Sequence, residues 1–169
     1  MKRLYLMRHA KSDWNISTRS DFDRTLNERG FRDASNMANR LKTAPYLPQQ
    51  IHHSAAIRTQ QTAQLVAEKI NLSSEYLIAH QSLYEAGINE YLKVIRTIPD
   101  TFQTVLLVGH NPTITHLVGY LTPKNITHMP TSAITCIQFE IGSWTAIEPL
   151  LGKFYWFDYP KNEFIPVYL

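Results

Sequence analysis

The sequence has a single cysteine, Cys136, and no long hydrophobic run. One cysteine cannot form a disulfide within its own chain, so we expect a protein of a reducing compartment. No segment approaches the roughly 20 apolar residues that cross a bilayer. The apolar run near the N-terminus, residues 4–7, is too short for the core of a signal peptide. We therefore expect a cytoplasmic protein that makes no contact with a membrane.

Motifs for metals and nucleotides are missing as well. No two of the seven histidines have the i, i+4 spacing of a zinc motif on a helix, and no cysteine pair could assist. The glycine-rich loops that bind nucleotide phosphates are absent, and so is the G-x-S-x-G turn of a serine hydrolase. We expect no metal and no cofactor, and we interpret His52, His53, His80 and His128 as ordinary polar residues.

The charges nearly balance, since 17 Lys and Arg face 14 Asp and Glu in a chain of 169 residues. The net charge of +3 is not gathered in a basic tail, so it suits an anionic ligand and does not call for nucleic acid. The length fits one domain with a sizeable core, and we expect residues 1–169 to form it.

Apolar runs alternate with segments of helical spacing along the chain. Strands are expected at 3–8, 49–54, 76–79, 104–108, 133–141, 144–148 and 153–159. Helices are expected from a capping box at Thr25 and Glu28 to about 42, and at about 55–70, 88–97 and 112–121. This order predicts an α/β fold, a three-layer α/β/α sandwich whose central sheet is mainly parallel. The closing strands resemble hairpins, which antiparallel pairing would suit.

Basic side chains follow the ends of the predicted strands. Arg8 and His9 follow the first strand, and His110 follows strand 104–108. Arg58 lies in the first turn of a helix, where the helix dipole favours anions over cations. Parallel strands end at one edge of a sheet, where ligands bind, so these four side chains are expected to converge. Two guanidiniums and two imidazoles match a phosphoryl group, because arginine binds its oxygens bidentately and a neutral imidazole can attack phosphorus.

Considered singly, each of these residues also has an ordinary interpretation on the protein surface. Segments that resemble a known family favour the joint interpretation. Residues 6–12 (LMRHAKS) resemble the R-H-G/A signature of the histidine phosphatase superfamily. Residues 23–30 (DRTLNERG) resemble an element of its SixA-type phosphohistidine phosphatase branch, and residues 54–59 (SAAIRT) and 108–112 (VGHNP) follow in the family's order. The matches cover about residues 3–145.

The resemblance implies a phosphoglycerate mutase-like fold and a role for each of these side chains. His9 becomes phosphorylated, while Arg8, Arg58 and His110 bind the phosphoryl group and stabilise its transition state. Asn15 stands where related enzymes place a phosphate-binding asparagine, although a plain loop residue is an equal interpretation. We expect His9 to be neutral when it attacks, and His110 to donate as a protonated ring beside the phosphate dianion.

The group that supplies the proton is left open. Many members of the superfamily use a carboxylate after the middle strand, and Glu85 is the candidate here, with a solvated turn residue as the alternative. A phosphoramidate leaving group could change which acid is needed.

Three functions fit these features. The first is a phosphatase that acts on a phosphohistidine-containing protein, favoured because no long insertion follows residue 70 to cover the site. The second is a phosphatase of the same superfamily that acts on a small phosphate ester such as a sugar phosphate. The third is a phosphoprotein-binding module without turnover. The partner in each case is a phosphorylated molecule, and the oligomeric state is left open.

The segment from Gly152 onward is unusually aromatic. Its rings are Phe154, Tyr155, Trp156, Phe157, Tyr159, Phe164 and Tyr168. We interpret the segment as an edge strand whose inner face belongs to the core, with a surface for a protein partner or a second copy as the alternative.

Overall fold

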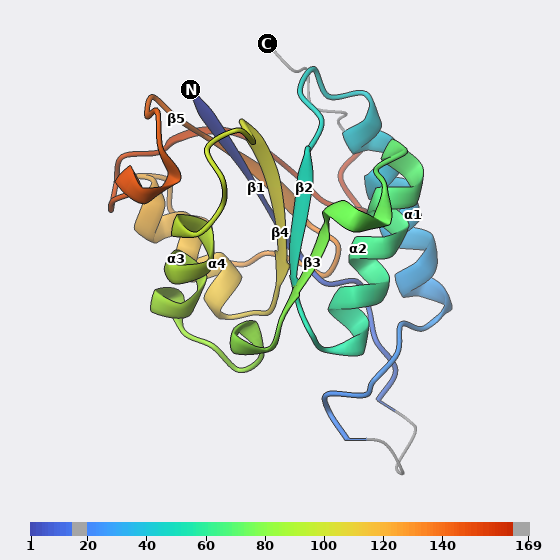
Figure 1. Ribbon diagram of the computed structural model, residues 1–169. Coiled ribbons are helices and arrows are strands. Elements are labelled where there is room, and N and C mark those ends of the chain that lie inside the picture. Colours follow the sequence, from blue (N-terminus) through green and yellow to red (C-terminus); the bar gives the residue numbers. More distant parts are fainter. Residues whose placement is uncertain (15–19, 164–169) are drawn as a thin grey trace.

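The computed structural model describes residues 1–14 and 20–163, which form a six-stranded sheet between two layers of helices (Figure 1). The strands are β1 (Lys2–Arg8), β2 (Gln50–Ser54), β3 (Leu77–His80), β4 (Thr104–Gly109), β5 (Ile134–Phe139) and β6 (Lys153–Asp158). Their order across the sheet is β3-β2-β4-β1-β5-β6. Strands β1 to β4 run parallel, whereas β5 and β6 pair antiparallel, which confirms the mainly parallel sheet.

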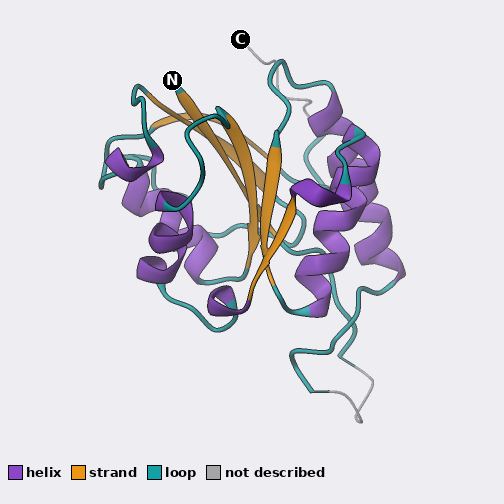
Figure 2. Ribbon diagram, in the orientation of Figure 1, coloured by secondary structure: helices purple, strands orange, loops and turns teal. Residues whose placement is uncertain are grey.

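The helices divide between the two faces of the sheet (Figure 2). They are α1 (Glu28–Lys42), α2 (Ile57–Ile70), α3 (Ile88–Arg96) and α4 (Thr113–Leu121). On β1, Leu4 and Leu6 belong to the core cluster of α3 and α4, while Tyr5 and Met7 belong to that of α1 and α2. Strand β1 therefore reads as a continuous apolar run because both of its faces are buried. Within the described ranges, no helix has the length and apolar character needed to cross a bilayer.

The register of the central strands places two histidines side by side. Arg8 at the end of β1 is the partner of Gly109 at the end of β4. The backbone N–H of His9 then donates to the carbonyl of Gly109 over 3.0 Å. His9 and His110 consequently leave the sheet at the same level and at the same edge.

The strand expected at 144–148 is wrong, because residues Trp144–Ala146 form a short 3₁₀ helix instead. Trp144 and Ile147 are both fully buried, and their spacing of three residues suits a helical turn rather than a strand. The Trp144 backbone N–H donates to the Asp100 carboxylate over 2.8 Å, and the indole N–H donates to the Phe102 carbonyl over 2.9 Å. These contacts fix the turn.

The capping box at Thr25 is also wrong, because α1 begins two residues later than expected. Leu26 pairs with Ser12 in an isolated antiparallel bridge, which keeps the chain extended up to Asn27. The Asn27 side chain then accepts from the backbone N–H of Gly30 over 2.9 Å and caps the helix. A side chain at Gly30 would overlap the backbone carbonyl of Lys11, so the first turn of α1 packs directly on the segment after β1.

The aromatic C-terminal segment contains the predicted edge strand. β6 lies at the border of the sheet, and Trp156 is buried with its ring 5.7 Å from that of Tyr5. Phe164 and Tyr168 lie outside the described residues.

Candidate active site

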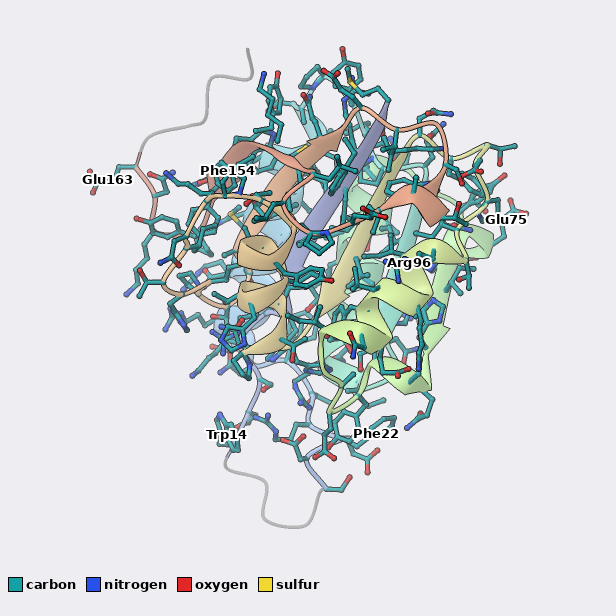
Figure 3. The ribbon with its side chains drawn as sticks, turned by 90° about the vertical axis from the view of Figure 1, so that its left-hand side faces the viewer. Trp14, Phe22, Glu75, Arg96, Phe154 and Glu163 are labelled. Carbon is teal, nitrogen blue, oxygen red and sulfur yellow. The ribbon has the colours of Figure 1, made fainter. Side chains whose placement is uncertain are left out.

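A cavity of about 290 Å³ opens at the edge of the sheet where β1 and β4 end. Its lining consists of Arg8, His9, Lys11, Ser12, Trp14, Asp21, Arg24, Arg58, Tyr84, Glu85, His110, Asn111 and Thr131. The structure thus brings together Arg8, His9, Arg58 and His110, and it adds Glu85 to the same wall. Asn15 lies outside the described residues. Figure 3 shows Trp14 and Phe22 at this end of the molecule, on the segment that follows β1.

His9 is buried, with 8% of its surface exposed, and its ring is held in one tautomer. Its Nδ1 lies 2.8 Å from the backbone carbonyl of Ala10. A carbonyl can only accept, so Nδ1 carries the hydrogen and Nε2 has a free lone pair. Burial lowers the pKa of His9 to about 3, helped by the charges of His110, Arg58 and Arg8 and opposed by the Ala10 hydrogen bond. His9 is therefore neutral at pH 7, as a nucleophile must be.

His110 is held in the opposite tautomer. Its Nδ1 lies 3.4 Å from an Nη of Arg58, which can only donate, so the ring hydrogen is on Nε2. Burial and then the positive charge of Arg58 lower the pKa of His110 to about 4. His110 is therefore neutral at pH 7 by itself, whereas the protonated ring expected from the sequence is that of His110 beside a bound phosphate dianion. A neutral Nε2–H still donates a hydrogen bond, so the donor role does not require the charge.

The backbone beside His110 packs against Tyr91, and this contact depends on Gly109. The rings of His9 and His110 lie 5.3 Å apart. A side chain at Gly109 would overlap the hydroxyl of Tyr91, which accepts from the backbone N–H of His110 over 3.1 Å. Tyr91 on α3 thereby fixes the backbone that carries His110. No sequence pattern linked Tyr91 to this position.

The side chains of Arg8 and Arg58 are each held by a hydrogen bond to a backbone carbonyl. Arg8 donates from Nη1 to the carbonyl of Met129 over 3.0 Å, and Arg58 donates from Nη1 to the carbonyl of Asp21 over 2.7 Å. The Nε atoms of both arginines are buried and have no partner among the described residues.

The Nε2 of His110 is in the same condition, so three donors beside His9 are buried and unpaired. Leaving a buried donor without an acceptor costs about 1–3 kcal/mol, more for a charged group. An oxyanion bound between these groups would supply the acceptors. The donor set therefore fits a phosphoryl group.

Asp21 and Tyr84 also line the cavity, but no sequence pattern identified them as site residues. The Tyr84 hydroxyl donates to Oδ2 of Asp21 over 2.8 Å, and its ring lies 6.0 Å from that of His110. Asp21 is 37 residues from Arg58 and 63 from Tyr84 along the chain, and no motif or periodicity links these positions.

Glu85 lies at the exposed side of the cavity with its backbone in the left-handed region, at φ 53°. Residues other than glycine adopt this conformation rarely, and such positions are concentrated at functional sites.

Three of the remaining histidines make contacts with other side chains that bear on the site or on each other. His128 lies beside the pocket, 3.4 Å from an Nη of Arg8, a proximity that the sequence did not indicate. His52 and His80 contact each other over 2.8 Å on β2 and β3, away from the cavity lining. In the part of the chain that the structure describes, no three His, Cys, Asp or Glu side chains form a group that could hold a metal ion.

Comparisons with known proteins agree with this geometry. A family model of the histidine phosphatase superfamily (branch 1) matches residues 4–91. An uncharacterized protein of Mycobacterium leprae is 30% identical over 167 residues, which cover 92% of this chain and 100% of the relative. The phosphohistidine phosphatase SixA of Escherichia coli K12 is 28% identical over 163 residues, 95% of each chain. A structure of the protein histidine phosphatase SixA complexed with tungstate superposes with a TM-score of 0.78 at 25% identity, over 94% of this chain and 97% of that one.

Proposed function

Since the chain belongs to the histidine phosphatase superfamily (branch 1), a membership that supports phosphatase activity, we propose that it hydrolyses phosphohistidine on a protein substrate. The single observation that carries this proposal is the set of three buried donors around the neutral His9 ring that have no partner among the described residues. The set provides both a nucleophile and a place for the oxygens of the group that it attacks.

In the proposed first step, the lone pair on His9 Nε2 attacks phosphorus in line with the leaving group. The bond from phosphorus to the leaving nitrogen breaks, and its electron pair goes to that nitrogen. Arg8, Arg58 and the Nε2–H of His110 hold the phosphoryl oxygens, because positioning and charge neutralisation supply most of the catalysis in phosphoryl transfer.

In the second step, water attacks the phosphoryl group on His9. The bond from phosphorus to Nε2 breaks, its electron pair returns to His9, and the water's proton leaves with the phosphate. The Nδ1–H of His9 keeps its bond to the Ala10 carbonyl through both steps, which holds the ring in the attacking tautomer.

Glu85 is proposed as the proton donor, with a role that depends on the leaving group. A leaving imidazole whose far nitrogen already carries a hydrogen departs as a neutral molecule. An alkoxide that leaves from a phosphate ester needs a proton at the oxygen itself. The carboxyl of Glu85 would therefore matter more for an ester than for phosphohistidine.

Two features favour a protein substrate over a small ester. Between β3 and β4 the chain has only α3 and short turns, so no long insertion there covers the cavity. The E. coli relative is named a phosphohistidine phosphatase, and the SixA structure holds tungstate, an oxyanion.

The test is a comparison of kcat/KM on a phosphohistidine-carrying protein and on a panel of phosphate esters, each with and without a chelator. We expect the higher value on phosphohistidine and no effect of the chelator. A preference for an ester would move the substrate to the small-molecule class. Binding without release of phosphate would make the protein a binding module, and loss of activity with chelator would contradict the metal-free mechanism.

A further inference from the structure

Asp21 makes more polar contacts with the candidate site than any group that sequence patterns had identified there. Its backbone carbonyl accepts from Nη1 of Arg58 over 2.7 Å, and its Oδ2 accepts from Nη2 of Arg58 over 3.1 Å. Both terminal nitrogens of Arg58 are therefore bound to one residue. Arg58 is buried, with 6% of its side chain exposed, whereas 45% of the Asp21 side chain is exposed.

The hydrogen bonds to Asp21 involve the two terminal nitrogens of the guanidinium and do not involve its Nε. The Nε of Arg58 is buried without a partner, and Nη2 also lies 3.4 Å from Nδ1 of His110. The guanidinium is planar and rigid, so fixing its terminal edge fixes the direction of the Nε–H as well. Asp21 holds Nη1 and Nη2, and Nη2 also faces His110, so among the described residues Nε–H is the donor of Arg58 that is left for an oxyanion.

Asp21 is itself held on both carboxylate oxygens. Tyr84 donates to Oδ2 over 2.8 Å, and Arg24 donates to Oδ1 from Nε over 2.9 Å. Arg24 also donates to the hydroxyl of Ser12 over 2.8 Å and stacks on the ring of Trp14 at 3.5 Å. These contacts tie the loop that carries Asp21 to the wall of the cavity.

The same loop explains how Arg58, a cation, can lie at the start of α2, where the helix dipole favours anions. The N-cap residue of α2 has no side-chain hydrogen bond, and the backbone N–H of Ile57 donates instead to the carbonyl of Phe22 over 3.1 Å. The Asp21 carboxylate brings to this helix N-terminus the negative charge that its dipole favours. Burial alone would raise the pKa of Asp21, but the Tyr84 hydrogen bond and the charges of Arg58 and Arg24 outweigh it and lower the pKa.

We propose that Asp21 is a positioning residue for the reaction, which orients Arg58 so that its Nε–H meets the phosphoryl oxygens. The inference rests on the proposed function, because it takes the group bound between Arg8, Arg58 and His110 to be a phosphoryl group. It assigns Asp21 an effect through Arg58 and no contact with the substrate.

The direction in which anion affinity changes when the Asp21 carboxylate is removed distinguishes this role from a simple charge effect. A carboxylate beside an anion pocket repels the anion, so removal of its charge should by itself tighten anion binding. Loss of the grip on Arg58 should weaken binding instead. Asp21→Asn keeps the size of the side chain and removes the charge, so it sets the two effects against each other.

The experiment measures inhibition by tungstate and turnover of a phosphohistidine protein for the wild type, Asp21→Asn, Tyr84→Phe and Asp23→Asn. Asp23 is the matched control, because it lies in the same loop and its carboxylate accepts from Ser20 over 2.6 Å. We expect Asp21→Asn to weaken tungstate binding and to lower kcat by about tenfold each, since small displacements of a positioning group cost up to about 10² in rate. Tyr84→Phe should give a smaller loss of the same sign, and Asp23→Asn none.

The same substitution in an Arg58→Ala background tests whether Asp21 acts through Arg58. In Arg58→Ala there is no guanidinium to orient, so Asp21→Asn should no longer weaken tungstate binding and should leave it equal or tighter. Tighter binding by Asp21→Asn in the wild-type background would overturn the proposal, and so would an equal loss in the Arg58→Ala background. Thermal unfolding of each variant separates these results from a folding defect, with Tyr84→Phe as the milder probe.

The failure of the proposed function would look different. A wild-type protein that binds tungstate but does not turn over phosphohistidine would overturn the proposed substrate, while the tungstate series would still decide the role of Asp21. A wild-type protein that does not bind tungstate would overturn both.

Discussion

Two pairs of histidine rings among the described residues, His9 with His110 and His52 with His80, lie close together, and they differ in their hydrogen bonds. The rings of His9 and His110 lie 5.3 Å apart, and those of His52 and His80 lie 5.1 Å apart. Burial lowers the pKa of His9 and of His52 to about 3 in each case. The second pair is closed, because His52 contacts His80 through Nδ1 and Gln50 through Nε2, both over 2.8 Å.

The first pair is open. In the described ranges the Nε2 of His110 is buried without a partner, as are the Nε atoms of Arg8 and Arg58, which line the same cavity. Burial and a lowered pKa are thus common to both pairs and do not identify a site. The gathering of three such donors around one cavity distinguishes the first pair, because an anion that enters the cavity could satisfy all three at once.

The largest expected difference between the pairs is in turnover. His9→Ala removes the nucleophile and should abolish release of phosphate from a phosphohistidine protein. His52→Gln leaves every group of the cavity in place and should leave kcat unchanged, although it should lower the unfolding temperature. Steady-state kinetics and thermal unfolding of both variants check this prediction. Full activity in His9→Ala would contradict the assignment of His9 as the nucleophile.

His110 and His80, the second members of the two pairs, should also differ in their effect on kcat, but by a smaller factor. His110→Gln removes the Nε2–H beside the phosphoryl oxygens, and loss of one such donor costs about 10²–10³ in kcat. His80→Gln, outside the cavity lining, should leave kcat unchanged. Equal losses in the two variants would remove the distinction between an open and a closed pair.

Stability should respond to pH in the same way for both pairs. An unfolded histidine has a pKa near 6.5, above the folded value of about 3 for His9 and His52. The unfolded state therefore binds more protons, and the unfolding free energy falls as the pH drops from about 7 towards 3. Each ring should contribute a loss of about 2 kcal/mol between pH 7.5 and 5.

Urea unfolding at these two pH values checks the prediction with variants of both rings. His9→Gln and His52→Gln should each make the pH dependence shallower by about that amount. An unchanged slope in either variant would mean that its ring is not buried in the neutral form.

The smallest effect is expected at Glu85, at the exposed side of the open pair. Glu85→Gln should lower kcat on a phosphate ester by about 10², the lower end of what a general acid contributes, and should change kcat on phosphohistidine only a few-fold. Similar losses on the two substrates would show that the leaving imidazole also needs this proton.

Much of the site could be predicted from the sequence because its residues follow strand ends. Arg8 and His9 end the apolar run of β1, and His110 ends that of β4, so the parallel sheet alone brings them together. Arg58 was identified by a cation at the wrong end of a helix. Each signal is local and has a physical reason.

The parts that could not be predicted depend on contacts between distant segments. Asp21 reaches Arg58 across 37 residues, and Tyr91 reaches His110 across 19, with no pattern that links either pair. The start of α1 is set by the bridge between Ser12 and Leu26, which overrides the local capping signal. The first pair of histidines was predicted as a site with a neutral His9, but the tautomers of its rings come from the packing.

The central claim is that His9 carries the phosphoryl group between the two steps. It is tested most directly by mixing the wild-type protein with a substrate that carries a labelled phosphoryl group on histidine, stopping the reaction within milliseconds in alkali, and mapping the label by mass spectrometry of its peptides. We expect a label on the peptide that contains His9, stable in alkali and lost in acid, and no label in His9→Ala. A label on another residue, or phosphate release by the wild type with no labelled protein at any time, would contradict the account.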